Sequence, residues 1–131
     1  MGISQRNKGQ RGERELFGML SDELGFVVKR NIDQIRAGGA DCIEIPGWAV
    51  ECKRCETLNI NAWWAQAEGQ AEKLTSYQNR VLPILFYRQA RQPWKAVINL
   101  NHILARSLHG KTHMAIIGFE TACGIIRESL A

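Results

Sequence analysis

The sequence predicts a protein of the α/β class, in which helices flank a central β-sheet. Segments with apolar residues at every third or fourth position, a helical period, alternate with short apolar runs that are typical of strands. The composition, with 45% hydrophobic and 23% charged residues, is that of a globular protein. The 131 residues fit one domain, 1–131, and the expected element order is α-β-β-β-α-β-β-α.

The N-terminal half is expected to contain one helix and three strands. Four apolar residues recur at helical spacing before a glycine stop signal: Leu16, Phe17, Leu20 and Leu24. A Pro46-Gly47 turn signal between two strand-like runs predicts an antiparallel hairpin. The expected elements are a helix at about 10–24, a strand at 26–31, a flexible glycine-containing loop at 32–40, and hairpin strands at 41–45 and 48–55.

The C-terminal half is expected to begin with a second helix. Five apolar residues form one stripe of this helix: Ile60, Trp64, Ala67, Ala71 and Leu74. Asn59 is available as its N-cap, and Trp64 is expected to pack in the core rather than Trp63, because neighbours on a helix are about 100° apart. The expected elements are helix 60–77, strands within 80–88 and 95–100, a short helical piece at 101–108, and a strand or turn followed by a helix within 114–130.

The charge distribution suggests a polyanionic partner. The net charge is +4, and no Asp or Glu occurs between Lys73 and Phe119, where seven basic residues fall. Such a field suits nucleic acid, although a solvated surface with a chance sign bias is the alternative. No run approaches the roughly 18 apolar residues of a membrane span, and the N-terminus lacks the apolar core of a secretory signal. A cytoplasmic location without a membrane partner is therefore expected.

The four cysteines include a C-x-x-C pair, Cys52 and Cys55. On a strand, residues three apart face opposite sides, and no second ligand pair for zinc is recognisable near Cys123 or the histidines. We therefore expect buried or half-buried thiols in a reducing compartment rather than a metal or redox centre.

Three acidic residues and one lysine are candidates for a common site. Glu51 and Lys53, two apart on an expected strand, project from one face. Glu13 lies on the apolar stripe of the first helix, where a carboxylate is costly unless it is paired or bound to a cation, or unless the stripe emerges into water there. Asp41 begins an apolar strand, or else caps a turn. Asp41 shares the face of Glu51 only if a three-residue loop or a β-bulge shifts the hairpin register.

The pattern GADCIEIPGWAVECKRC resembles the core of the PD-(D/E)XK nucleases, with Asp41 followed by Glu51-Cys52-Lys53. Together with KGQRGERELFGMLSDELGF it is similar to the archaeal-type Holliday-junction resolvases and their phage relatives. The likeness covers residues 8 to about 100, and Asp41 lacks the preceding proline. The resemblance implies a restriction-endonuclease-like core with a mixed sheet of about five strands, and Glu13, Asp41, Glu51 and Lys53 as catalytic residues.

The resemblance also implies a divalent cation, Mg²⁺, for which Mn²⁺ can substitute. Asp41 and Glu51 would be direct ligands, with the Cys52 carbonyl as a third, and Glu13 would hold a water of the metal or a second ion. Lys53 would orient or deprotonate the attacking water, or stabilise the charged phosphate. These two roles stay open.

The activity implied is that of a metal-dependent DNA endonuclease acting on a four-way junction as a homodimer, since a junction presents two symmetric scissile strands. A restriction-like or repair nuclease acting on other DNA, and a non-catalytic nucleic-acid-binding module, are the alternatives. Gln66 is preferred over Gln70 as the glutamine of the helix after the catalytic strand. The candidate DNA contacts are Lys8, Arg11, Arg14, Arg36, Arg54, Gln66, Arg88 and Arg91.

Overall fold

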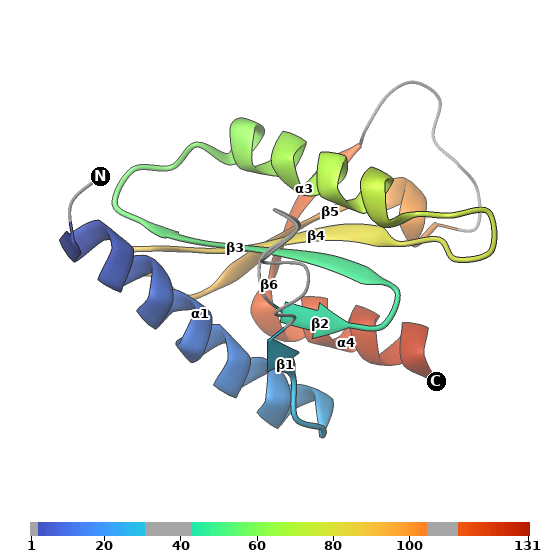
Figure 1. Cartoon of the computed structure of the whole chain (residues 1–131), viewed down its shortest axis with the longest axis horizontal. Helices are drawn as coiled ribbons and strands as arrows, with labels where there is room; N and C mark the ends of the chain where they lie inside the picture. Colours follow the sequence, from blue (N-terminus) through green and yellow to red (C-terminus); the bar gives the residue numbers. More distant parts are fainter. Residues whose placement is uncertain (1–2, 31–42, 105–112) are drawn as a thin grey trace.

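The computed structural model describes residues 3–30, 43–104 and 113–131 (Figure 1). For residues 3–10, 29, 30, 43 and 44 it describes the backbone alone. Arg36 and Asp41, the loop expected at 32–40, and residues 105–108 of the helical piece expected at 101–108 lie outside the described residues.

Within the described residues, the chain forms a mixed sheet of six strands in the order β1-β2-β3-β4-β5-β6. Strands β3 and β4 are parallel, and every other neighbouring pair is antiparallel. The strands are β1 (Lys29–Arg30), β2 (Ile43–Ile45), β3 (Trp48–Cys55), β4 (Leu82–Gln89), β5 (Lys95–Asn99) and β6 (Met114–Gly118). Four of the six have five residues or more. The expected mixed sheet flanked by helices is confirmed, and β6 settles the choice between strand and turn in favour of a strand.

In the part of the chain that the structure describes, three helices cover the two faces of this sheet (Figure 1). Helices α1 (Ile3–Leu24) and α4 (Phe119–Leu130) pack on one face, and α3 (Ile60–Leu74) packs on the other. A short 3₁₀ turn, η1 (Leu100–His102), follows β5. Among these helices, none combines the length and the apolar character that are needed to cross a membrane.

The core is divided by the sheet into two clusters, because strand side chains alternate between its faces. The face covered by α1 and α4, called the α1 face below, includes Val50, Cys52, Ile84 and Phe86, which pack with helix residues such as Leu16. The face covered by α3, called the α3 face, includes Leu85, Tyr87 and Val97, which pack with Trp64 and Ala67. Trp64 is only 4% exposed, as expected, and Trp63 is half-buried beside this second cluster.

The element bounds differ from expectation where local chemistry overrides the apolar pattern. Helix α1 starts at Ile3 instead of residue 10, because the polar residues before its apolar stripe are compatible with a helix. Helix α3 ends at Leu74 because Thr75 turns into extended backbone, where its hydroxyl bonds both the N–H and the carbonyl of Val81. Asn59 occupies the N-cap position of α3, but its side chain makes no capping hydrogen bond.

The first strand is shorter than its apolar sequence suggested. Phe26 and Val27 are 40% and 75% exposed, and β1 begins only at Lys29. The cysteines on the α1 face are buried: Cys52 and Cys123 belong to its core, and burial, with Glu23 nearby, raises the pKa of the Cys123 thiol to about 12. Cys55 is half-buried.

Candidate active site

Strand β3 presents Glu51 and Lys53 together on the α3 face of the sheet. The parallel register with β4 pairs Glu51 with Leu85 and Lys53 with Tyr87, and both partners belong to the core of that face. The intervening Cys52 points to the opposite face, where it packs in the other core. The strand period therefore places the two charged side chains side by side, as the sequence predicted.

The two charges form a partly buried ion pair. Lys53 Nζ lies 3.4 Å from Glu51 Oε1, and the Glu51 side chain is only 1% exposed while that of Lys53 is 29% exposed. Burying a carboxylate is costly unless an opposite charge or hydrogen-bond donors compensate it, and the ammonium supplies part of this compensation. Glu51 is thus fixed below the surface, and Lys53 connects it with solvent.

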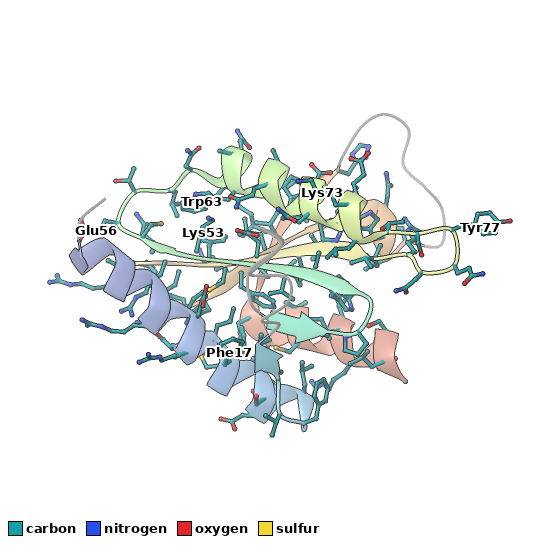
Figure 2. The ribbon with its side chains drawn as sticks, in the orientation of Figure 1. Phe17, Lys53, Glu56, Trp63, Lys73 and Tyr77 are labelled. Carbon is teal, nitrogen blue, oxygen red and sulfur yellow. The ribbon has the colours of Figure 1, made fainter. Side chains whose placement is uncertain are left out.

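Helix α3 covers this pair with its first turns. Figure 2 shows Lys53 on the side of β3 that faces Trp63. The Trp63 ring lies 6.4 Å from the ring of Tyr87, the register partner of Lys53, at a tilt of 43°. Burial raises the pKa of the Tyr87 hydroxyl above its usual value, so this group stays protonated at neutral pH. Further along α3, Gln66 is exposed and Gln70 is half-buried.

Glu13 lies on α1, which packs on the face of the sheet opposite to the one that carries the Glu51 side chain. The buried stripe of α1 is formed by Gly12, Leu16 and Leu20, and Glu13 is half-buried on one flank of it. Within the described residues, β2 pairs with β3 only at Trp48 and Ala49. Convergence of Glu13 with Glu51 and Lys53 on one pocket stays a prediction.

The hairpin register bears directly on Asp41. The Pro46-Gly47 turn has Gly47 at φ 81°, the left-handed conformation that a type II turn requires at this position. It pairs Ile45 with Trp48 and Glu44 with Ala49, so the three-residue loop that would bring Asp41 to the face of Glu51 is absent at this turn. That alternative is wrong. The other, a β-bulge, would fall outside the described residues, as Asp41 does, and remains a prediction.

A divalent cation such as Mg²⁺ needs several oxygen ligands around it. Among the described residues, no group of three or more His, Cys, Asp or Glu side chains is arranged to hold a metal ion. Glu51 itself fits, because Mg²⁺ prefers carboxylate oxygens and is held by one or two of them together with a substrate phosphate. The sulfur of Cys52 is buried on the α1 face, so only the carbonyl of this residue can serve as a ligand.

The predicted DNA contacts fall into two groups where the structure describes them. Arg11 and Arg14 are exposed on α1, and Arg91 is exposed in the link between β4 and β5. Arg54 and Arg88 instead lie on the α1 face, where both form ion pairs with Glu15 of α1. Glu15 could not be predicted from the sequence, since its partners lie on β3 and β4 and no local pattern connects them. Of Lys8, only the backbone, within α1, is described.

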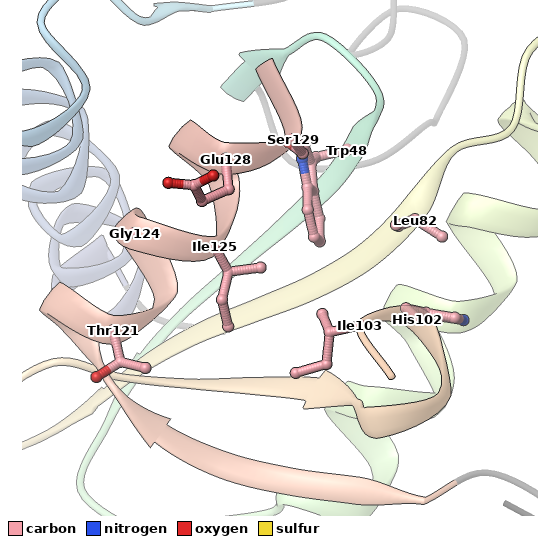
Figure 3. A pocket seen from close by; sticks show the side chains of 9 residues that line it. All are labelled: Trp48, Leu82, His102, Ile103, Thr121, Gly124, Ile125, Glu128 and Ser129. Carbon is pink, nitrogen blue, oxygen red and sulfur yellow. The ribbon is translucent and has the colours of Figure 1, made fainter. Parts of the chain in front are cut away.

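A separate apolar pocket of about 600 Å³ lies beside α4 (Figure 3). Trp48 and Ile125 form part of its wall, and Trp48 Nε1 donates a hydrogen bond to Ser129 Oγ at 2.9 Å. His102 lines its other side; burial, then the charge of Arg80, lowers the pKa of this imidazole. Because Trp48 belongs to the core of the α1 face, this pocket is on the opposite side of β3 from Glu51.

A mixed sheet between α1 and α3, with a Glu-x-Lys pair on the strand β3, is the arrangement expected of the PD-(D/E)XK class. Residues 4–126 match the family model described as "Phage putative PDDEXK endonuclease", and the chain belongs to this family. The match extends past residue 100, where the resemblance seen in the sequence ended. No match was found among the curated proteins or among the solved structures.

Proposed function

We propose that this single-domain nuclease is a metal-dependent DNA endonuclease whose active site is built on β3. The observation that supports this most strongly is the ion pair between the buried Glu51 carboxylate and the Lys53 ammonium. The chain belongs to a PD-(D/E)XK family, and phosphodiester hydrolysis requires charge to be neutralised in the active site. A buried carboxylate paired with a partly exposed ammonium suits such a site.

The proposed metal is Mg²⁺, with Mn²⁺ as a substitute. Asp41 and Glu51 are proposed as direct ligands, with the carbonyl of Cys52 as a third, and Glu13 would hold a water or a second ion. When bound, the cation would help to activate water and to neutralise charge on the phosphate and the leaving oxygen. Lys53 would meet the phosphate or the attacking water from the solvent side, and its 29% exposure supports this role.

The proposed substrate is branched DNA, most specifically a four-way junction cut by a homodimer in the host cytoplasm. The excess of basic residues supports a phosphate-binding surface. The proposed contacts are Lys8, Arg11, Arg14, Arg36, Arg54, Gln66, Arg88 and Arg91. The family description names an endonuclease without naming its DNA, so duplex-cutting relatives are the competing possibility.

Incubation with labelled DNA tests this proposal. Four-way junctions, flaps, duplexes and single strands should be compared in Mg²⁺, Mn²⁺ and EDTA, with Glu51→Gln as the control for contaminating nucleases. We expect symmetric cleavage of junctions in either metal and none in EDTA. Equal cleavage of junctions, flaps and plain duplexes would show that ordinary duplex DNA, and not specifically the junction, is the substrate. Absence of metal-dependent cleavage of any DNA would contradict the proposal.

A further inference from the structure

The Glu15 side chain connects α1 with three other parts of the fold. Its Oε1 accepts hydrogen bonds from Arg88 Nη1 of β4 and from Trp94 Nε1, the latter at 3.1 Å. Its Oε2 lies 3.7 Å from Arg54 Nη1 of β3. Arg88 is held in turn, because its Nε donates to the carbonyl of Gln92 at 2.9 Å. One carboxylate therefore links the helix with β3, with β4 and with the segment before β5.

This contact is better built than an ordinary surface ion pair. Trp94 is 4% exposed and belongs to the core of the α1 face, so one donor to Glu15 is fixed by packing. The side chains of Arg54 and Arg88 are each only 27% exposed, and they are neighbours in the parallel register of β3 and β4. The carboxylate therefore receives two hydrogen bonds, from Arg88 and Trp94, and an ion-pair contact from Arg54.

Close packing next to Glu15 limits how α1 can move. A Cβ placed on Gly12 would lie 3.0 Å from the Cβ of Arg54, so a larger residue at this position would need the helix or the strand to shift slightly. The close approach at Gly12 and the ion pair of Glu15 both connect α1 with β3. Both contacts involve Arg54, which follows Lys53 directly on β3.

Helix geometry relates this contact to Glu13. At about 100° per residue, Glu13 and Glu15 are about 160° apart around α1, so they flank the buried stripe on opposite sides. Glu15 turns toward β4 and β5, and Glu13 therefore turns toward the outer edge of β3. A rotation that loosened Glu15 would move Glu13 by the same angle.

We propose that Glu15 is a positioning residue, which fixes the rotation of α1 and thereby holds Glu13 at the edge of β3 near Glu51 and Lys53. This inference rests on the proposed function, in which Glu13 takes part in catalysis. It also gives Arg54 and Arg88 a role within the protein, as the partners of Glu15. Small displacements of a group in an active site are enough to slow a reaction strongly.

Amide hydrogen exchange tests the structural half of this proposal without DNA or metal. Glu15→Gln keeps the size of the side chain and removes its charge, and Asp22→Asn removes the same charge from an exposed position of the same helix. We expect the amides of α1 to exchange about tenfold faster in Glu15→Gln than in Asp22→Asn. Trp94→Phe keeps a buried ring and removes one donor to Glu15, so it should also speed the exchange of the α1 amides. This variant replaces Glu15→Gln if the latter folds poorly. Equal exchange of α1 in all these variants would overturn the proposal.

Single-turnover cleavage tests the functional half. We expect Glu15→Gln to lower the rate about 10- to 100-fold while DNA affinity stays within about twofold of the wild type. In a Glu13→Asp background the same substitution should have a much smaller effect, because Glu15 acts through residue 13. An equal effect in both backgrounds would indicate a merely structural role and overturn the proposal. If the wild type itself does not cleave DNA, the proposed function fails, and the exchange data still report on the contact of α1.

Discussion

Glu51 and Lys53 carry opposite charges on one face of β3, but they differ in their access to water. The carboxylate is 1% exposed and the lysine 29% exposed. Removing the lysine would leave a buried negative charge with less compensation, whereas removing the carboxylate would leave an ammonium that can still reach solvent. The free energy of unfolding of the protein should therefore change by different amounts when Lys53 or Glu51 is replaced.

This inequality can be measured by chemical denaturation. Lys53→Met should lower the free energy of unfolding by about 1–3 kcal/mol, because a buried charged group loses a partner. Glu51→Gln should leave it unchanged or raise it, since a carboxylate at an active site is held at a cost in stability. Equal destabilisation by both substitutions would show that the two side chains contribute to folding symmetrically, contrary to the burial pattern.

At the scale of the elements, the contact between α1 and β3 decides where Glu13 lies. The two glycines Gly12 and Gly18 allow this contact to be tested within one helix. A Cβ at Gly12 would meet the Cβ of Arg54 at 3.0 Å, whereas a Cβ at Gly18 would meet nothing within 4 Å. Alanine improves helix propensity at both positions, so the difference between them reports the packing alone.

We expect Gly18→Ala to raise the free energy of unfolding by about 0.5–1 kcal/mol, the usual gain for alanine over glycine in a helix. Gly12→Ala should instead lower it, because the helix must move away from β3, and cleavage should slow as Glu13 moves with it. Thermal melts and cleavage rates of the two variants provide the comparison. A gain in stability at Gly12 similar to that at Gly18 would show that α1 is not packed this tightly on the strand.

The sequence predicted those elements whose apolar pattern agrees with their burial. In α3 and β3 the apolar pattern agrees with burial, so the buried Trp64 and the shared face of Glu51 and Lys53 were predicted correctly. Phe26 and Val27 looked like strand residues but are exposed, so β1 was placed too early. Apolar character alone does not show which side chains find a partner surface.

The candidate site was only partly predictable for a related reason. Strand parity is local, so the pairing of Glu51 with Lys53 could be inferred from two positions in the sequence. The face that α1 covers, and the contact of Glu15 with Arg54 and Arg88, depend on long-range packing that no short pattern encodes. The sequence therefore did not predict that Arg54 and Arg88, two of the proposed DNA contacts, also form ion pairs with Glu15.

At the scale of the whole molecule, the segment between Lys73 and Phe119 combines seven basic residues with no acidic one. Within it, Arg88 is held by Glu15, while Arg91 is exposed in the link after β4. Arg91 has φ 65°, in the left-handed region that favours glycine. Arg91→Gly therefore removes a charge from this surface without straining the backbone.

If this link contacts DNA, the affinity should depend on salt through its phosphate contacts. Arg91→Gly should lower the slope of log Kd against log salt concentration by about one, and equally for unrelated DNA sequences. Arg127→Gln, on α4, removes a charge elsewhere and serves as the control. Fluorescence anisotropy titrations over a range of salt concentrations give both slopes. An unchanged slope for Arg91→Gly would exclude this link from the DNA-binding surface.

The central claim is that the Glu51 carboxylate on β3 is essential for DNA cleavage, and Glu51→Gln tests it most directly. The substitution keeps the shape of a side chain that is 1% exposed, so a folded protein is expected. Cleavage in Mg²⁺ should be abolished, while DNA affinity should be retained or increased because a negative charge near the phosphate is removed. Cleavage by Glu51→Gln at close to the wild-type rate would contradict the assignment of the active site to β3.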